Sequence, residues 1–336
     1  MSAAHTVAHS HDLRRAAMTQ PVISIIMPTF NRLQFLRPAV DSVFAQTFTE
    51  WELIIGDDGS GPETSAYLQG LDDPRVTVLW LPHTGKPSVV SNIALREARG
   101  EFVAFLDSDD LWLPKKLEAQ LESLRKHPER KWSYTKFAVV DALSRPIVAA
   151  RIRDWPTPTG WILEKLLEEV TVIAQPSVVV SRQLLDQLGA FDEELVMCYD
   201  DELWFRLAAH SEIDGVDIPL TLVRRHEHHS GGDMIAWRDR RRVFEKALRA
   251  SGGGHLEPIL HRLRAQMSAG LAKSQAASGR RMSALATVFT SLPHSWAYPK
   301  CWLGALGAIA RAFAPAALRT LVRHYRQKRR VPSVVP

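Results

Sequence analysis

The stretch FVAFLDSDDLWLP, residues 102–114, joins an apolar run to a cluster of carboxylates. Five consecutive apolar residues that stop at polar ones are typical of a strand buried on both faces of a parallel sheet. Asp107 and Asp109 are alternate residues directly after this run. Because ligands bind beyond the carboxyl ends of the strands in such sheets, the stretch predicts a functional site at the end of this strand.

Two upstream strands end in polar residues in the same way. The polar residues are Thr29-Phe30-Asn31-Arg32 after the apolar run 22–27, and Asp57-Asp58-Gly59-Ser60 after the run 51–56. Helical patterns lie between the runs, and strands that alternate with helices predict a parallel, doubly wound α/β sheet. Three strand ends are therefore expected to converge on one site.

The spacing of Asp107 and Asp109 suits a divalent metal ion. Mg²⁺ and Mn²⁺ prefer oxygen ligands and are commonly held by one or two carboxylates together with phosphate oxygens. A lone Asp-x-Asp is a weak motif, and a solvated turn or a helix cap before residues 111–114 is an alternative explanation. The convergence of three polar strand ends favours the metal site.

Composition excludes disordered and fibrous classes. The chain has 336 residues, of which 46% are hydrophobic, enough for a large core and a smaller appendage. Two cysteines are too few for a disulfide framework and fit a reducing compartment. Residues 1–20 are polar and His-rich without an apolar stretch, which predicts a disordered leader and a catalytic part that stays in the cytoplasm.

Charge is segregated along the chain. The formal net charge is +5, but no acidic residue follows Glu257, whereas 13 of the 42 Lys and Arg residues do. The part up to Glu257 holds 29 basic and 37 acidic residues. We therefore expect a domain over residues 21–232 and a basic, helical C-terminal region over residues 233–336. One-sided basic regions bind anionic surfaces, either nucleic acid or acidic membrane headgroups.

The basic region also contains apolar side chains. Trp302, Leu303 and Leu306 lie in an apolar stretch among the cationic residues of this region. Apolar anchors beside cations favour a peripheral position on the inner face of the cell membrane over nucleic acid, so no nucleic acid is expected. Arg311 interrupts the apolar stretch before it could span a bilayer. Helices that pack on the catalytic domain, or on another copy of it, are the alternative.

Taken together, these motifs resemble glycosyltransferase family 2. The resemblance covers residues 21–230, and besides the segments above it is carried by Asn92–Gly100, Gly189-Ala190-Phe191-Asp192 and Asp200–Leu207. It implies a Rossmann-like nucleotide-diphospho-sugar transferase fold of A type, with a mixed, mainly parallel sheet. The C-terminal helical appendage lies outside it.

The resemblance also implies roles for particular residues. Those that contact the nucleotide sugar are Thr29, Phe30, Arg32, Asp58, Asn92 and Asp107. Asp109, with Asp107, would hold Mg²⁺ or Mn²⁺. For Asn92, helix capping is the alternative. The run Arg224–Ser230 resembles the family's closing basic segment, which contacts the diphosphate.

The family's catalytic base lies in a Glu-Asp pair before Leu-Trp and Arg. Counting back from Leu203, the base position falls on Asp200, with Tyr199 where Glu is common and with Asp201 as the runner-up. A base that faces the anomeric carbon opposite the leaving diphosphate gives direct displacement with inversion. Acidic residues that stabilise a helix N-terminus are the alternative explanation of this cluster.

The implied protein is an inverting glycosyltransferase that transfers a sugar from a nucleotide-diphosphate donor to a glycan or lipid-linked acceptor, in cell-surface polysaccharide or glycolipid synthesis. Two alternatives remain. A sugar nucleotidyltransferase would carry a basic glycine-rich signature early in the chain, which the first seventy residues lack. A non-catalytic, membrane-associated scaffold would have lost Asp109 or the base, and both positions are filled.

Overall fold

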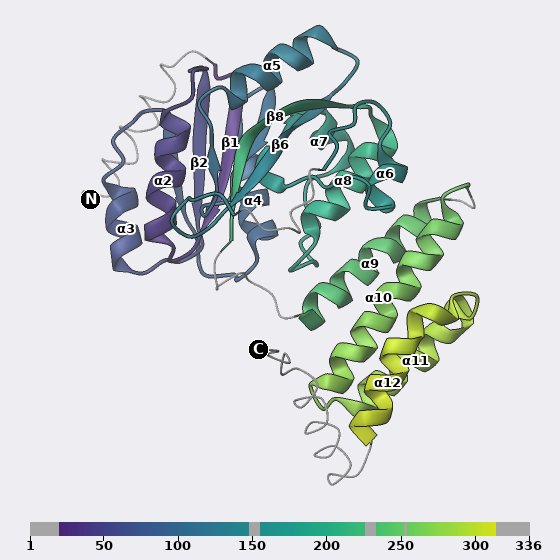
Figure 1. Cartoon of the computed structure of the whole chain (residues 1–336). Coiled ribbons are helices and arrows are strands. Elements are labelled where there is room, and N and C mark those ends of the chain that lie inside the picture. Colours follow the sequence, from purple (N-terminus) through teal and green to yellow (C-terminus); the bar gives the residue numbers. More distant parts are fainter. Residues whose placement is uncertain (1–19, 148–154, 226–232, 252–253, 314–336) are drawn as a thin grey trace, which may run out of the picture. The chain divides into compact units, whose positions relative to one another are not determined.

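The computed structural model of the chain describes residues 20–147, 155–225, 233–251 and 254–313 (Figure 1). The chain divides into two compact units, residues 1–229 and residues 230–336. Residues 1–19 of the predicted leader, and the predicted domain boundary between residues 232 and 233, lie outside the described residues.

Within the described residues, the first unit contains a sheet of eight strands in the order β3-β2-β1-β4-β7-β6-β8-β5. The strands are β1 (Ile23–Thr29), β2 (Trp51–Asp57), β3 (Val76–Trp80), β4 (Phe102–Phe105), β5 (Leu111–Trp112), β6 (Trp132–Val140), β7 (Val178–Ser181) and β8 (Ile213–Arg224). Strand β1 pairs in parallel with β2 and β4, and β2 pairs in parallel with β3. Strand β7 runs antiparallel to β4 and β6. The mixed, mainly parallel sheet predicted from the sequence is confirmed.

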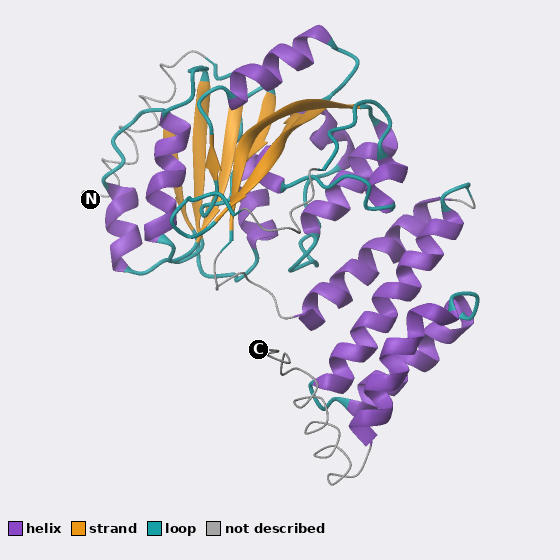
Figure 2. Cartoon of the chain, viewed as in Figure 1, coloured by secondary structure: helices purple, strands orange, loops and turns teal. Residues whose placement is uncertain are grey.

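Helices cover both faces of this sheet (Figure 2). They are α2 (Leu33–Phe44), α3 (Pro62–Gln69), α4 (Pro87–Arg96), α5 (Lys116–Lys126), α6 (Leu163–Leu167), α7 (Arg182–Leu188) and α8 (Tyr199–His210), with a 3₁₀ turn, η1, over Gln175–Ser177. In β1, Ile25 and Met27 belong to one core together with α2, α3 and α5. Ile26 points the other way, into a second core with α4, α6, α7 and α8. Two covered faces explain why the central strands are almost entirely apolar.

The second unit is helical. Its helices are α9 (Asp233–Ser251), α10 (Glu257–Ala277), α11 (Arg281–Ser295) and α12 (Pro299–Phe313). Helix α10 packs against α9, α11 and α12. A side chain at Gly270 of α10 would come within 2.5 Å of the Trp237 ring, so the glycine allows α9 to approach closely. None of the described helices is long and apolar enough to cross a bilayer.

The position of Trp302 differs from the membrane-facing one that the sequence predicts. It is only 4% exposed and packs in the core of the helical unit with Ala272, Ala284 and Ile309. Its indole Nε1 donates a hydrogen bond to Ser295 Oγ at 3.1 Å. Trp302 therefore stabilises the unit from inside, and the interpretation that it faces a membrane is wrong.

Candidate active site

The polar strand ends converge as the sequence predicts. Thr29 is the last residue of β1 and Asp57 the last of β2, and the two are register partners. The segment 107–110 follows β4, the other parallel neighbour of β1. Because these strands are parallel, their carboxyl ends lie at one edge of the sheet.

Helix α8 brings a further carboxylate to this edge. Burial, followed by the charges of Asp109 and Asp200, raises the pKa of Asp107 to about 8, while the charge of Arg32 lowers it. Asp200 therefore lies within electrostatic reach of Asp107, although the two are far apart in sequence. Asp201 is the next residue of α8. Successive residues of a helix point about 100° apart, so the two carboxylates face different directions.

Two arginines hold the segment 107–110. The guanidinium of Arg32 forms an ion pair with the carboxylate of Asp109. Arg224, at the end of β8, is 1% exposed and donates from its guanidinium to the carbonyl oxygen of Asp109 at 2.7 Å. Its backbone N–H donates to Asp110 Oδ1, also at 2.7 Å. Arg224 thus lies behind the carboxylates, whereas the resemblance implied that its run contacts the diphosphate; residues 226–230 of that run lie outside the described residues.

Two side chains that sequence reasoning did not assign to the site, Tyr199 of α8 and Gln175 of η1, interact with Asp107. The pKa of Tyr199 is raised well above its ordinary value by burial and by the charges of Asp107, Asp200 and Asp109. Gln175, in η1, donates from Nε2 to Asp107 Oδ1 at 3.2 Å and also hydrogen-bonds to Tyr199. Gln175 belongs to no recognisable sequence motif, so only the fold identifies it.

A loop after β3 forms the opposite wall. The carboxylate of Asp58 accepts hydrogen bonds from the backbone N–H groups of Thr84 at 2.7 Å and Gly85 at 2.9 Å. The Nδ1 atom of His83 lies 3.0 Å from the same carboxylate. The His83 ring stacks on Phe30, with ring centroids 4.1 Å apart and an interplanar angle of 22°. Asp58 therefore holds in place a half-exposed pair of rings beside the end of β1.

Two buried oxygens near this wall lack hydrogen-bond partners. Among the described residues, Thr29 Oγ1 and Asp57 Oδ1 are both buried and unpaired. The other Asp57 oxygen accepts from the backbone N–H of Ser60 at 3.1 Å, as expected of a turn residue. Buried polar atoms are nearly always paired in folded proteins, so these two are candidates to bind water or a ligand.

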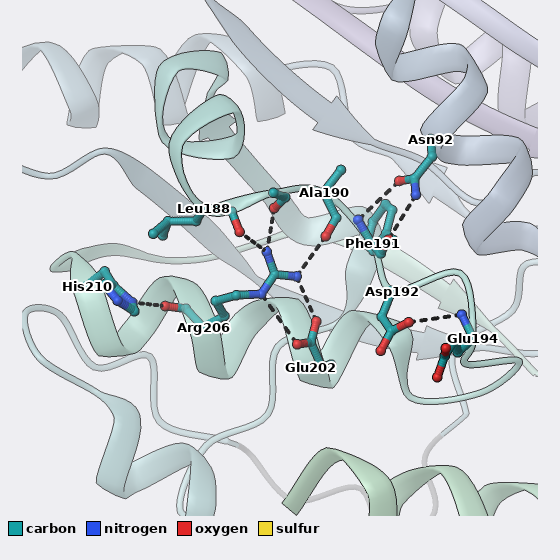
Figure 3. A network of polar contacts seen from close by, with 10 residues as sticks. Asn92, Leu188, Ala190, Phe191, Asp192, Glu194, Glu202, Arg206 and His210 are labelled. Carbon is teal, nitrogen blue, oxygen red and sulfur yellow. Dashed lines mark hydrogen bonds and ion pairs between the residues drawn. The ribbon is translucent and has the colours of Figure 1, made fainter. Parts of the chain in front are cut away.

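Asn92 lies inside α4, so it is not a helix cap. Its amide binds the segment that precedes α8 (Figure 3). The amide nitrogen donates to the Phe191 carbonyl at 2.8 Å and to Glu193 Oε1 at 2.9 Å, and the amide oxygen accepts from the Phe191 N–H at 3.1 Å. The hydrogen-bonding groups of this side chain are thus turned toward the 191–193 segment.

Arg206 of α8 holds the same segment from the other side (Figure 3). Its guanidinium donates to the carbonyl oxygens of Leu188 and Ala190, each at 2.7 Å, and also to that of Gly189. Glu202, one turn earlier on α8, pairs with Arg206 at 2.7 Å. Asn92 and Arg206 together fix the path of the chain into the helix that carries Asp200.

The acidic cluster suits a hard divalent cation. Within the described residues no three His, Cys, Asp or Glu side chains form a metal cluster. Asp107 and Asp109 fit a different kind of site, in which one or two carboxylates bind Mg²⁺ or Mn²⁺ and phosphate oxygens complete the coordination. Burial and mutual repulsion raise the pKa of Asp107 and of Asp110 and so favour their protonated forms. A divalent cation held by these carboxylates would favour the ionised forms.

Comparison with known proteins defines the class of this fold and site. A family model described as glycosyl transferase family 2 matches residues 24–134. The chain is 30% identical over 200 residues to the UDP-Glc:alpha-D-GlcNAc-diphosphoundecaprenol beta-1,3-glucosyltransferase WfgD of Escherichia coli, which covers 60% of this chain and 75% of the relative. It is 42% identical over 105 residues to the putative teichuronic acid biosynthesis glycosyltransferase TuaG of Bacillus subtilis, covering 31% of this chain and 42% of the relative.

Solved structures share the fold. TarS of S. aureus (residues 1–349, in complex with UDP-GlcNAc) superposes with a TM-score of 0.56 at 20% identity, covering 87% of this chain and 81% of that one. The mannosyltransferase PcManGT of Pyrobaculum calidifontis, in complex with GDP-Man and Mn²⁺, gives a TM-score of 0.53 at 18% identity and covers 94% of each chain. The chain belongs to glycosyltransferase family 2, and it is a glycosyltransferase.

Proposed function

We propose that this glycosyltransferase inverts the anomeric centre in a metal-assisted direct displacement, with a nucleotide-diphosphate sugar as donor and a glycan or lipid-linked hydroxyl as acceptor. The observation that carries the proposal is the convergence of Asp107 and Asp109, at the end of β4, with Asp200 at the start of α8. The name of WfgD specifies a UDP-glucose donor and a diphosphoundecaprenol-linked acceptor, and that of TuaG specifies teichuronic acid biosynthesis. These names support a role in cell-surface polysaccharide or glycolipid synthesis.

The donor nucleoside would bind at the β1–β2 end. The stacked rings of Phe30 and His83 offer an aromatic surface for a base. The unpaired oxygen of Thr29 can accept or donate a hydrogen bond to the nucleoside, and Asp58 supports the loop on which His83 lies. Arg32, which pairs with Asp109, has a guanidinium suited to phosphate oxygens. We assign Asn92 a positioning role, because its amide is engaged by the 191–193 segment.

The reaction would divide its tasks between the two groups of carboxylates. Bound by Asp109 and Asp107, Mg²⁺ or Mn²⁺ would neutralise the charge that develops on the leaving diphosphate. Asp200 would accept the proton of the acceptor hydroxyl, which requires an approach of about 2.6–3.2 Å. Attack from the side opposite the leaving group inverts the anomeric centre and needs no glycosyl-enzyme intermediate. Gln175, which also hydrogen-bonds to Tyr199, would hold Asp107 in place beside this base.

A screen of nucleotide sugars tests the proposal. The purified chain is incubated with UDP- and GDP-sugars, with and without Mn²⁺ or Mg²⁺, and release of nucleoside diphosphate is measured. We expect metal-dependent release from one donor, reduced by roughly 10²-fold or more in Asp109→Ala, because a preorganised charge that stabilises the transition state is lost. Asp186→Ala is the matched control, since Asp186 is 71% exposed on α7.

Other results would identify other functions. Release of pyrophosphate from a nucleoside triphosphate and a sugar phosphate would indicate a sugar nucleotidyltransferase. Failure to hydrolyse or bind any nucleotide sugar, as judged by calorimetry, would indicate a non-catalytic scaffold. Because a lipid-linked acceptor lies at a membrane, the proposal also includes a peripheral position on the anionic inner face of the cell membrane.

A further inference from the structure

Helix α11 exposes several of its large apolar side chains, whereas Leu285 and Val288 pack partly against the core of the unit. Met282 and Phe289 are 73% and 67% exposed, and Trp296, directly after the last residue of α11, is 77% exposed. These three residues are spaced seven apart, two helical turns, so they lie along one face. The buried residues of the opposite face are small or polar: Ala284, Thr287, Ser291 and Ser295. A helix on the surface of a water-soluble domain has the reverse arrangement.

Helix α12 extends this exposed face. Leu303, Leu306 and Phe313 are 71%, 50% and 46% exposed. The Arg281 guanidinium lies 5.7 Å from the centroid of the Phe313 ring, and the Trp302 indole bonds to Ser295 Oγ. The start of α11 thus meets the end of α12, and the end of α11 meets the start of α12, so the helices form an antiparallel pair.

We call the exposed apolar side chains of this pair the α11–α12 face: Met282, Phe289, Leu292, Trp296, Leu303, Leu306 and Phe313. Among the described residues of the helical unit, no other large apolar side chain is exposed, and α9 and α10 contribute none. Alanines of α10 cover the inner side of the pair. An apolar surface confined to one side of a unit is typical of an interaction site.

Helices α11 and α12 themselves carry basic residues and no acidic ones. No acidic residue follows Glu257 anywhere in the sequence, and Lys273, Arg280 and Lys300 are exposed. Arg281 lies over the Phe313 ring at the edge of the face. Apolar side chains, an aromatic residue such as Trp296 and flanking cations are the combination that binds the interface of an anionic bilayer.

We propose that the α11–α12 face docks in the plane of an anionic membrane, with Phe289 and Trp296 as its main anchors. A second copy of this chain is the weaker occupant, because two such faces would bring cations against cations, whereas anionic headgroups complement them. The inference rests on the proposed function, because the proposed lipid-linked acceptor is found at such a surface. It assigns the anchoring to α11, and not to Trp302 as the sequence pattern indicated.

Vesicle sedimentation of the full-length chain tests the face. The vesicles are phosphatidylcholine alone, or phosphatidylcholine mixed with an equal amount of phosphatidylglycerol. We expect binding to the mixed vesicles, weakened by high salt, and a partition coefficient at least about tenfold lower for Phe289→Ser/Trp296→Ser, because two aromatic side chains no longer enter the bilayer. Both residues are exposed, so the substitutions leave the helical core intact.

Two matched variants serve as controls. One removes an exposed aromatic side chain outside the face, and the other changes the side chains of the face but keeps them apolar. Trp161→Ser removes a tryptophan that is 62% exposed in the catalytic unit, and we expect it to bind as the wild type does. Phe289→Leu/Trp296→Phe, which keeps the face apolar, should retain most of the binding. Equal binding by the Ser/Ser variant and the wild type would overturn the proposal.

Sedimentation velocity without lipid completes the test. A monomeric wild type is expected, and a dimer that dissociates in Phe289→Ser/Trp296→Ser would overturn the proposal in favour of a second copy. Vesicle binding requires neither donor nor acceptor. Absence of vesicle binding by the wild type, with metal-dependent donor hydrolysis intact, would therefore refute the docking face alone, whereas absent hydrolysis with intact vesicle binding would refute the proposed reaction alone.

Discussion

At the scale of single residues, the site depends on which of two adjacent carboxylates faces the strand ends. Asp200 raises the pKa of both Asp107 and Tyr199, whereas the side chain of Asp201, the next residue of α8, points in a different direction. Cys198, immediately before α8, has a left-handed backbone with φ of 58°. A non-glycine residue in this conformation is uncommon and is often found at functional sites. The local backbone therefore sets the first turn of α8, and with it the direction of Asp200.

Substitution of the two carboxylates separates their roles. For Asp200→Asn we expect kcat of sugar transfer to fall by roughly 10²–10⁴-fold, the usual contribution of a general base, with little change in KM for the donor. Asp201→Asn should retain most of the activity and serves as the control. The measurement is steady-state transfer with the donor identified by the screen. If Asp201→Asn were the inactive variant, the base would be Asp201.

At the scale of elements, the segment 188–195 connects two parts of the site. It is held by Asn92 of α4, which follows the loop that Asp58 binds, and by Arg206 of α8, which carries Asp200. Phe191 adds an edge-to-face contact with Phe105 of β4 at 5.0 Å. Helix α8 is thus bound to this segment through backbone carbonyls, and the segment contacts the sheet through Phe191, so the position of Asp200 depends on contacts outside its own helix.

Removing the guanidinium should weaken this connection. Arg206→Ala leaves three carbonyls and the buried Glu202 without their donor, and we expect a loss of about 2–3 kcal/mol in the free energy of unfolding. Urea denaturation measures the loss. Lys126→Ala removes an exposed ion pair on α5 and should leave stability unchanged. Wild-type stability of Arg206→Ala would mean that water replaces the guanidinium.

At the scale of the whole molecule, the chain has separate cores in its two units. The cores that contain β1 and α8 are built from the first unit only. The cluster around Trp302 is built from α10, α11 and α12 only. Stability and catalysis can therefore be perturbed independently, because no buried side chain of these clusters is shared.

A cavity in the helical unit tests this independence. Trp302→Ala removes the largest side chain of its cluster and should destabilise the helical unit by about 3–5 kcal/mol. Hydrogen exchange is expected to increase in α10, α11 and α12, while donor hydrolysis by the catalytic unit stays unchanged. Loss of hydrolysis at a temperature where the sheet remains protected from exchange would contradict the separation of the units.

The sequence by itself determined the strands and the acidic strand ends. The run 102–106 and the run 22–27 are apolar at every position or nearly so, and a strand covered on both faces requires that pattern locally. The carboxylates at 107 and 109 come directly after the first of these runs, so their place at a strand end is also predicted from the local sequence. Phe30, Asp58 and the 200–201 pair were predicted as site residues from the resemblance to the family's motifs.

The tertiary structure alone decided which side chains complete the site and which face of each C-terminal helix points outward. Gln175 reaches Asp107 across 68 residues of sequence, and Asn92 reaches Phe191 across 99. In α11 and α12, helical periodicity defines faces but does not say which one meets α10. The small residues of α11 and Trp302 of α12 pack inward, because close contact of helices favours small side chains and one large one that fills the remaining space.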